Sequence, residues 1–242
     1  MKRYISTIVA LFAVACVTTA SAQEFSVGAK VGLNISTASS HGEDIEGRDQ
    51  YRAPRFGASA GITAEYKFNE SVSLSGEVLF SQQGVRYKYP TVEGLYDDDT
   101  EEYGSYEDCT VTHRFSYINV PILFNYYFVK NLRMSFNVGI QPGFLVSENS
   151  TTKLSNSDGF SKEYNGAYNW DLEPSGYSDA GYKVFDLAVP IGITWGFTEH
   201  ITFDMRYSIG VINTFKESEH YDYDKDYRST NNSFTLSVGY KF

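Results

Sequence analysis

The chain has 242 residues, with 20 Lys and Arg against 30 Asp and Glu, so its formal net charge is −10. An aromatic content of 16% argues against a disordered chain. The sequence pI near 4.9 argues against nucleic acid as a partner, because phosphate binding needs a basic patch. Two cysteines are too few for a disulfide scaffold or a Cys-based zinc site.

The first 22 residues predict a secretory signal peptide. After a basic start, Tyr4–Val17 is mostly apolar and uncharged, and Ala20 and Ala22 form the small-residue pattern that signal peptidase accepts. Cleavage would leave 23–242 as one domain. The apolar run is shorter than the roughly 20 residues of a membrane-spanning anchor. A lipidated Cys16 is disfavoured, since the usual Leu three positions earlier is missing.

Eight later segments alternate apolar and polar side chains with period two, which is the signature of a strand. No stretch has a sustained period of 3.6 residues, so the mature chain is predicted to be all-β. The segments lie at 25–34, 56–68, 72–81, 118–128, 132–144, 185–197, 201–211 and 234–242.

The links between these segments alternate strictly between short and long. Tight links lie at 69–71, 129–131 and 198–200, and long ones at 35–54, 87–113, 148–182 and 214–230. Short periplasmic turns and longer extracellular loops are the plan of an outer-membrane barrel. We therefore predict an eight-stranded antiparallel transmembrane β-barrel with four long extracellular loops. Its first and last strands should pair, because an open edge is not tolerated in lipid.

Alternation alone does not say which face points outward, and a soluble lipocalin-like barrel would enclose the apolar face. Glycines gather on the polar face, where a narrow barrel interior needs small residues. They are Gly28, Gly32, Gly57, Gly61, Gly139, Gly143, Gly192, Gly196, Gly210 and Gly239. Aromatic residues sit near the ends of the apolar faces, as expected at membrane interfaces. They include Tyr66, Phe68, Tyr126, Phe128, Trp195, Phe197, Tyr240 and Phe242.

Charges on the polar face nearly balance, which favours a lumen filled by ion pairs, because buried charges need partners. The predicted lumen network comprises Lys30, Glu65, Lys67, Glu77, Arg133, Asp186, Asp204, Arg206 and Lys241. The positions of these residues along their strands suggest that Asp186 pairs with Arg206 or Lys241.

Four internal segments resemble the PorT-like outer-membrane β-barrel family. They are Ser81-Gln82-Gln83-Gly84, Tyr117-Ile118-Asn119-Val120-Pro121-Ile122-Leu123, Phe185-Asp186-Leu187 and Arg206-Tyr207-Ser208-Ile209-Gly210. The ending 232–242 is similar to the family's terminal strand. Its final aromatics, Tyr240 and Phe242, are typical of the signal that the barrel-assembly machinery recognises. The resemblance implies a porin-family architecture in the outer membrane of a Gram-negative cell, and one named member belongs to a secretion system.

Catalytic chemistry is not evident in the sequence, so we predict that the chain is not an enzyme and needs no cofactor. The four His residues have no metal-ligand spacing. His113 and Ser116 at the outer end of one strand would point to opposite faces. Asp222, Asp224 and Asp226 begin like a calcium-binding loop, but Tyr227 and Ser233 replace the Gly and Glu that such a loop needs.

The four long links hold 23 of the 30 acidic residues and only 8 cations. A solvated surface explains this simply. A divalent cation bridging Asp97, Asp98, Asp99, Glu101 and Glu102 to lipopolysaccharide is a second interpretation. The interleaved tyrosines would equally suit an unknown extracellular partner. Cys109 is the single cysteine of the predicted mature chain, so its thiol has no cysteine to pair with in a disulfide.

The leading hypothesis is thus a structural or interaction barrel with a plugged polar lumen, surrounded by outer-membrane lipid and lipopolysaccharide. A narrow porin-like channel or a secretion-associated barrel is the alternative. A soluble lipocalin-like binder and a lipid-modifying barrel enzyme come last.

Overall fold

The computed structural model describes residues 25–41, 50–97, 102–157, 159, 161–165, 182–214 and 228–242. The predicted signal peptide, with Ala20 and Ala22, lies outside them. Among the described residues no helix is long and apolar enough to cross a membrane. The strands are β1 Phe25–His41, β2 Arg52–Lys67, β3 Val72–Tyr89, β4 Val92–Asp97, β5 Glu102–Tyr106, β6 Asp108–Asn119, β7 Ile122–Val129, β8 Met134–Ser155, β9 Ser161–Asn165, β10 Phe185–Gly196, β11 Ile201–Gly210 and β12 Arg228–Lys241.

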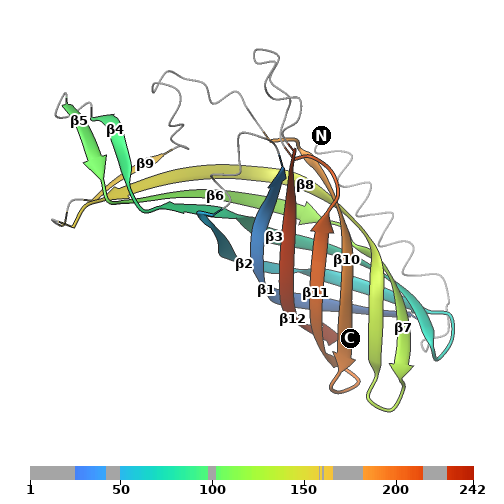
Figure 1. Ribbon diagram of the computed structural model, residues 1–242. Helices are drawn as coiled ribbons and strands as arrows, with labels where there is room; N and C mark the ends of the chain where they lie inside the picture. The colour runs from blue at the N-terminus through green and yellow to red at the C-terminus, as the bar shows by residue number, and fades with distance from the viewer. Residues whose placement is uncertain are drawn as a thin grey trace.

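The strands form a closed antiparallel ring (Figure 1). Its order is β1, β2, β3, then β6 and β7 end to end, followed by β8, β10, β11 and β12. The ring closes where β12 pairs with β1, from Gly28 opposite Lys241 to His41 opposite Arg228. Counting β6 and β7 as one interrupted strand gives the predicted eight-stranded barrel, and the predicted pairing of its first and last strands is confirmed.

The fourth barrel strand is broken at Val120 and Pro121. Proline has no N–H to donate to the ladder, so β6 ends before it and β7 begins after it. The carbonyl of Pro121 still accepts a hydrogen bond from Glu77 N, at 2.9 Å. The ladder between the third and fourth strands is therefore nearly continuous, and the predicted strand at 118–128 runs across the interruption at Pro121.

The two faces of the ring differ as the alternation predicted. Large apolar side chains point outward and are exposed, among them Leu33, Phe56, Ile62, Phe124, Phe136, Ile140, Trp195, Met205, Leu236 and Val238. Polar side chains point inward and are buried, among them Asn34, Ser73, Glu77, Asn137, Asp204, Arg206 and Ser237. The apolar face is thus outside, the reverse of a lipocalin-like barrel.

Three strands run well past the barrel and form a projecting sheet. β3, β6 and β8 remain paired up to Tyr89, Cys109 and Ser155, and β9 adds to the edge of β8 (Figure 1). The hairpin β4–β5 lies at the tip. The sequence analysis placed most of this region in long loops, because few apolar residues mark it. One face nevertheless packs into a small cluster of Tyr106, Cys109, Val111 and Leu154.

Gly61 of β2 shows why the barrel interior needs glycine. A Cβ at this position would lie 2.0 Å from the Val78 carbonyl oxygen and 2.8 Å from Leu79 Cα, both on the neighbouring strand. Backbone cannot move aside as a flexible side chain can. We predict that Gly61→Ala costs about 1–3 kcal/mol or prevents assembly. Gly76→Ala is the matched control, since its Cβ would meet nothing within 4 Å.

Heat-modifiable gel mobility of the refolded barrel checks this prediction, because a folded barrel migrates differently from the unfolded chain. Equal folded fractions for the Gly61→Ala and Gly76→Ala variants would contradict the close-approach argument.

Candidate functional site

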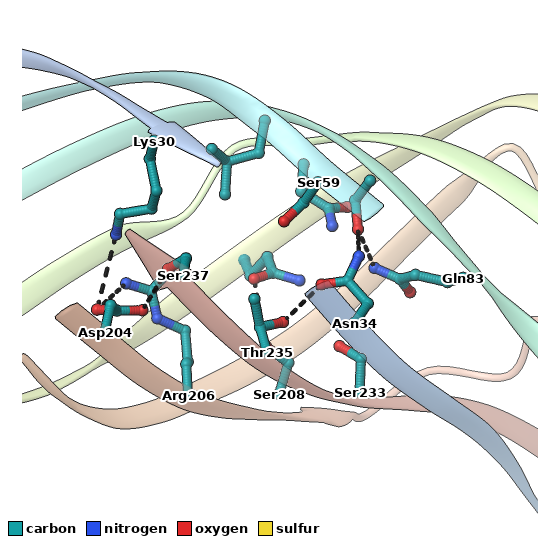
Figure 2. A pocket seen from close by; sticks show the side chains of 14 residues that line it. Lys30, Asn34, Ser59, Gln83, Asp204, Arg206, Ser208, Ser233, Thr235 and Ser237 are labelled. Atoms are coloured by element: carbon teal, nitrogen blue, oxygen red, sulfur yellow. Dashed lines mark hydrogen bonds and ion pairs between the residues drawn. The ribbon is translucent and has the colours of Figure 1, made fainter. Parts of the chain in front are cut away.

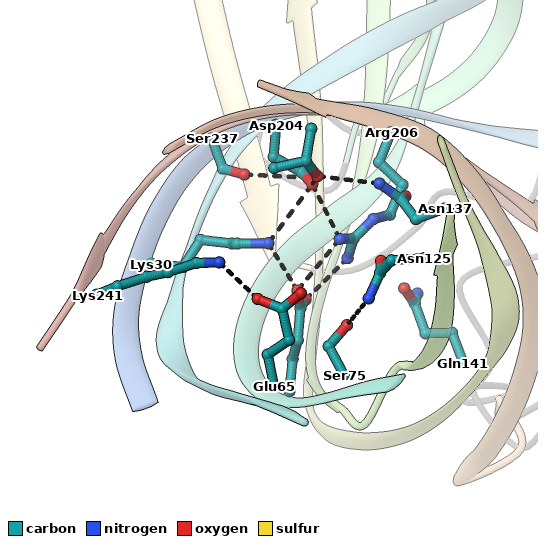
Figure 3. Close-up of polar contacts among 12 residues, drawn as sticks. Lys30, Glu65, Ser75, Asn125, Asn137, Gln141, Asp204, Arg206, Ser237 and Lys241 are labelled. Carbon is teal, nitrogen blue, oxygen red and sulfur yellow. Dashed lines mark hydrogen bonds and ion pairs between the residues drawn. The ribbon is translucent and has the colours of Figure 1, made fainter. Parts of the chain in front are cut away.

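The centre of the lumen holds four charged side chains that pair with one another, here called the central ion cluster (Figure 3). Lys30 Nζ lies 2.6 Å from Glu77 Oε1 and 3.6 Å from Asp204 Oδ2. Arg206 donates from Nη1 to Glu77 at 2.8 Å and from Nη2 to Asp204 at 3.1 Å. All four residues are buried. Two cations and two anions therefore neutralise each other across the middle of the barrel.

The strand pattern explains why these residues meet. Lys30, Glu77, Asp204 and Arg206 occupy inward positions of β1, β3 and β11, so the ion pairs cross the lumen from β3 to β11 and β1. The Thr194 hydroxyl donates to Asp204 at 2.7 Å. These contacts give each of the four charges a partner of opposite sign in the low-dielectric interior, where an unpaired charge would cost several kcal/mol.

A second polar group lies nearer the tight-turn end of the barrel and centres on Glu65. Lys241 Nζ donates to Glu65 Oε2 at 2.5 Å, and the Ser73 hydroxyl donates to Oε1 at 2.6 Å. The Tyr127 hydroxyl also donates to Oε1. Lys67 Nζ lies 5.2 Å from the centre of the Tyr127 ring, in a cation–π position, and so borders this group without joining it through an ion pair.

Two other residues of the predicted network make no ion pair with a described residue inside the lumen. Arg133 does not point into the lumen: it sits in the β7–β8 turn with φ 48° and pairs with exposed Glu199 at 2.7 Å. Its turn conformation breaks the alternation that suggested an inward position. Asp186 is buried, but it accepts a hydrogen bond from Leu187 N at 2.7 Å. The pairing we suggested with Arg206 or Lys241 is absent, because those cations are held by Glu77, Asp204 and Glu65.

The free space beside the central ion cluster is small (Figure 2). The cavity has a volume of about 20 Å³ and is lined mainly by hydroxyl and amide side chains, with Lys30, Asp204 and Arg206 at one side. Such a volume has room for about one water molecule. Asn34 lies across the lumen and bonds to Ser81 at 3.0 Å and to Thr235 at 2.9 Å. Side chains rather than an aqueous channel fill this level of the barrel.

An aromatic cap lies above the lumen, on the inward face of the projecting sheet. Phe115, Tyr117 and Tyr182 form a buried cluster. The Nδ1 atom of His113 lies 2.8 Å from the Ser150 hydroxyl and 3.3 Å from that of Tyr182. Burial lowers the pKa of His113 to about 4, so its ring is neutral at pH 7. Ser116 points to the opposite face of the strand from His113, as the spacing predicts. No sequence motif predicted the contacts of His113 with Ser150 and Tyr182.

The predicted surface sites are described only in part. Asp97 and Glu102 pair in register at the ends of β4 and β5, while Asp98, Asp99 and Glu101 lie outside the described residues. Within the described part of the chain, no group of His, Cys, Asp or Glu could hold a metal ion. Tyr240 and Phe242 are exposed at the tight-turn end. Cys109 is buried, and burial raises the pKa of its thiol to about 12, so it is unreactive near neutral pH.

Glu77→Leu tests the central ion cluster. The substitution would leave Lys30 and Arg206 buried without their main anion, which should cost about 3–5 kcal/mol or block assembly. Urea titration of the barrel in lipid vesicles measures the loss. Glu199→Gln, which removes an exposed carboxylate that makes one ion pair, should leave the urea midpoint of unfolding unchanged. Equal midpoints for both variants would contradict a stabilising cluster.

The aromatic cap should weaken in acid. In the folded protein the pKa of His113 is about 4, below its usual 6.5, so protonation favours a state in which the aromatic cap has opened and the ring is exposed to water. The stability that neutral His113 contributes to the closed cap is complete above pH 6.5 and is lost as the pH falls towards 4. Amide hydrogen exchange at Phe115 and Ser150, corrected for intrinsic rates, should show more opening at pH 5 than at pH 7. His113→Gln should abolish the difference, and a difference that persists would refute the role of His113.

Solved structures resemble this chain at low sequence identity. Ail, the attachment invasion locus protein of Yersinia pestis, is 13% identical, with 90% of this chain and 99% of that chain covered and a TM-score of 0.42. Neisserial surface protein A (NspA) is 14% identical, with 90% and 97% covered and a TM-score of 0.42. OprG from Pseudomonas aeruginosa is 14% identical, with 90% and 95% covered and a TM-score of 0.40. Comparison with curated protein sequences gives no match.

The family comparison covers most of the chain. The model of the outer membrane protein beta-barrel domain matches residues 21–216. The match begins just before the predicted mature N-terminus and continues through β11. With its closed ring of strands and outward apolar face, the chain belongs to the outer membrane protein beta-barrel domain family.

Proposed function

We propose that this protein is a small, closed barrel of the PorT-like type with a structural or interaction role in the outer membrane. The observation that carries the proposal is the central ion cluster, which spans the lumen between β3 and β11. A hydrated solute would have to separate these pairs in order to pass, and each separated charge would be left in a poorly solvated interior. The barrel then serves as an anchor rather than a conduit.

The proposal includes how the protein reaches its site. The predicted signal peptide at 1–22 exports the chain, and the exposed Tyr240 and Phe242 at the end of β12 present the terminal signal to the barrel-assembly machinery. The tight turns face the periplasm. The acidic, tyrosine-rich segments at the opposite end then face outward, where they would meet lipopolysaccharide, directly or through divalent cations, or an extracellular partner.

A non-enzymatic role is also part of the proposal. His113, the strongest catalytic candidate of the sequence, is half-buried in the aromatic cap and hydrogen-bonded to Ser150. The Cys109 thiol is buried in the cluster of Val111 and Leu154. Both groups are better explained by packing than by chemistry.

Planar-bilayer recording distinguishes the anchor from a narrow porin-like channel. The wild-type barrel should give no steady single-channel current. Glu77→Ala combined with Arg206→Ala removes an anion and a cation together and leaves Lys30 with Asp204, so it should permit current without stranding a charge. Heat-modifiable mobility must first establish that the double variant is folded.

Steady wild-type currents would overturn the anchor proposal in favour of transport. A folded double variant that remains closed would refute the assignment of the block to the central ion cluster.

A further inference from the structure

Four cations lie on the outward face of the projecting sheet, and we call them the basic patch. Arg86 and Lys88 belong to β3, Arg114 to β6 and Lys153 to β8. The alternation of the strands sets this orientation, since the residues between them turn inward. Inward-facing residues of the same three strands include Val85, Val111, Phe115 and Leu154, and all four are buried.

The register of the three strands brings the patch together. Arg114 lies opposite Gly84 on β3, and Arg86 is two positions further along that strand. Thr110 separates Lys88 on one side from Lys153 on the other. Diagonal neighbours on one face of a sheet are about 7–8 Å apart, so three of the four cations lie in a continuous run. Lys153 is two strands from Lys88, or about 10 Å.

Among the residues that the structure describes, the carboxylates on this face lie at the margin of the patch. Glu163 on β9 lies opposite Lys153, and Asp108 lies two positions beyond Thr110 on β6. The other outward positions between the cations are Thr110, Thr112, Asn149 and Thr151. The ion pairs of the described residues do not include any cation of the patch.

Positive charge is crowded around the patch. Arg55 lies just beyond exposed Phe56 on β2 and donates from Nη1 to the Gln83 carbonyl at 2.6 Å. Burial lowers the pKa of Arg55, and so do the nearby charges of Arg114 and Arg86. An arrangement that concentrates arginines in this way favours an anion as its counterpart.

The height of the basic patch above the band of exposed apolar side chains on the barrel indicates where this anion would be. The exposed Phe144 and Val146 of β8 mark the upper limit of the band on these strands. Arg114 lies opposite Asn149, three residues beyond Val146 and therefore about 10 Å along the strand. Tilt of the strands shortens this height above the hydrocarbon. The headgroup layer, several Å thick on each side of the bilayer, reaches the level of Arg114. Lys153 lies four residues further along β8, beyond that layer.

We infer that the basic patch binds the phosphate groups of anionic lipid in the outer leaflet. The planar guanidinium groups of Arg86 and Arg114 suit two-pronged contact with phosphate oxygens, and Lys88 and Lys153 add charge beside them. This contact is direct and begins at headgroup height with Arg114, unlike the cation-bridged contact considered for the acidic segments. The inference depends on the proposed membrane location but not on whether the lumen conducts.

Titration of the folded barrel with micelles containing a diphosphorylated glycolipid tests the inference, with bound lipid counted by native mass spectrometry. The dephosphorylated glycolipid is the matched ligand. Wild type should bind the phosphorylated form at least tenfold more tightly, and Arg86→Gln combined with Arg114→Gln should remove most of that preference. Lys130→Gln combined with Arg133→Gln removes two cations from the opposite end and should change nothing.

Three results would overturn the inference. Wild type could bind both glycolipids equally, or the Arg86→Gln/Arg114→Gln variant could retain the preference while folded. A soluble sulfated oligosaccharide that binds the patch in place of the glycolipid would assign it to glycans instead. Bilayer recordings of the same preparations test the closed lumen separately, so the two proposals fail independently.

Discussion

Inside a hydrocarbon layer every backbone N–H and C=O must find a partner within the protein, and this requirement shapes the whole molecule. The pairing of β12 with β1 meets it, since it removes the last free edges of the eight-stranded ring. Closure in turn separates two environments. The outward face meets lipid and needs only apolar side chains, whereas the inward face is cut off from both lipid and bulk water.

In a narrow ring the enclosed side chains can contact only one another. Charged residues such as Glu77 and Arg206 are buried, so they are tolerable only because they meet each other and their neighbours Lys30 and Asp204. Glycines such as Gly61 let the backbones of adjacent strands approach closely inside the narrow ring. Plugging of the lumen is therefore a consequence of how a small barrel is filled. The surface beyond the membrane is what remains available for interaction.

Alternation and the order of short and long links were sufficient to predict the ring, because both depend on the period-two pattern of long strands. The outward face was predicted from the glycines and balanced charges of the polar face and from the aromatic residues at the strand ends. Closure of the ring was predicted because lipid tolerates no open edge. Alternation was insufficient where the period-two pattern stops. Arg133 lies at a strand end, where the φ of 48° turns it towards Glu199 instead of the lumen. The partners of Asp186 depend on the relative height of strands far apart in the sequence. The projecting parts of β6 and β8 are rich in Ser, Thr and charged residues, so their pattern resembles a loop.

The outward position of the apolar face is the central claim, and spin-label accessibility in vesicles tests it most directly. Labels at Leu236 and Val238 of β12, introduced singly with Cys109 replaced by Ser, can be probed with dissolved oxygen and with a water-soluble relaxation agent. The account predicts strong collision with oxygen and little with the aqueous agent at both positions. Ready access of the aqueous agent to both labels in the folded, vesicle-bound barrel would contradict it.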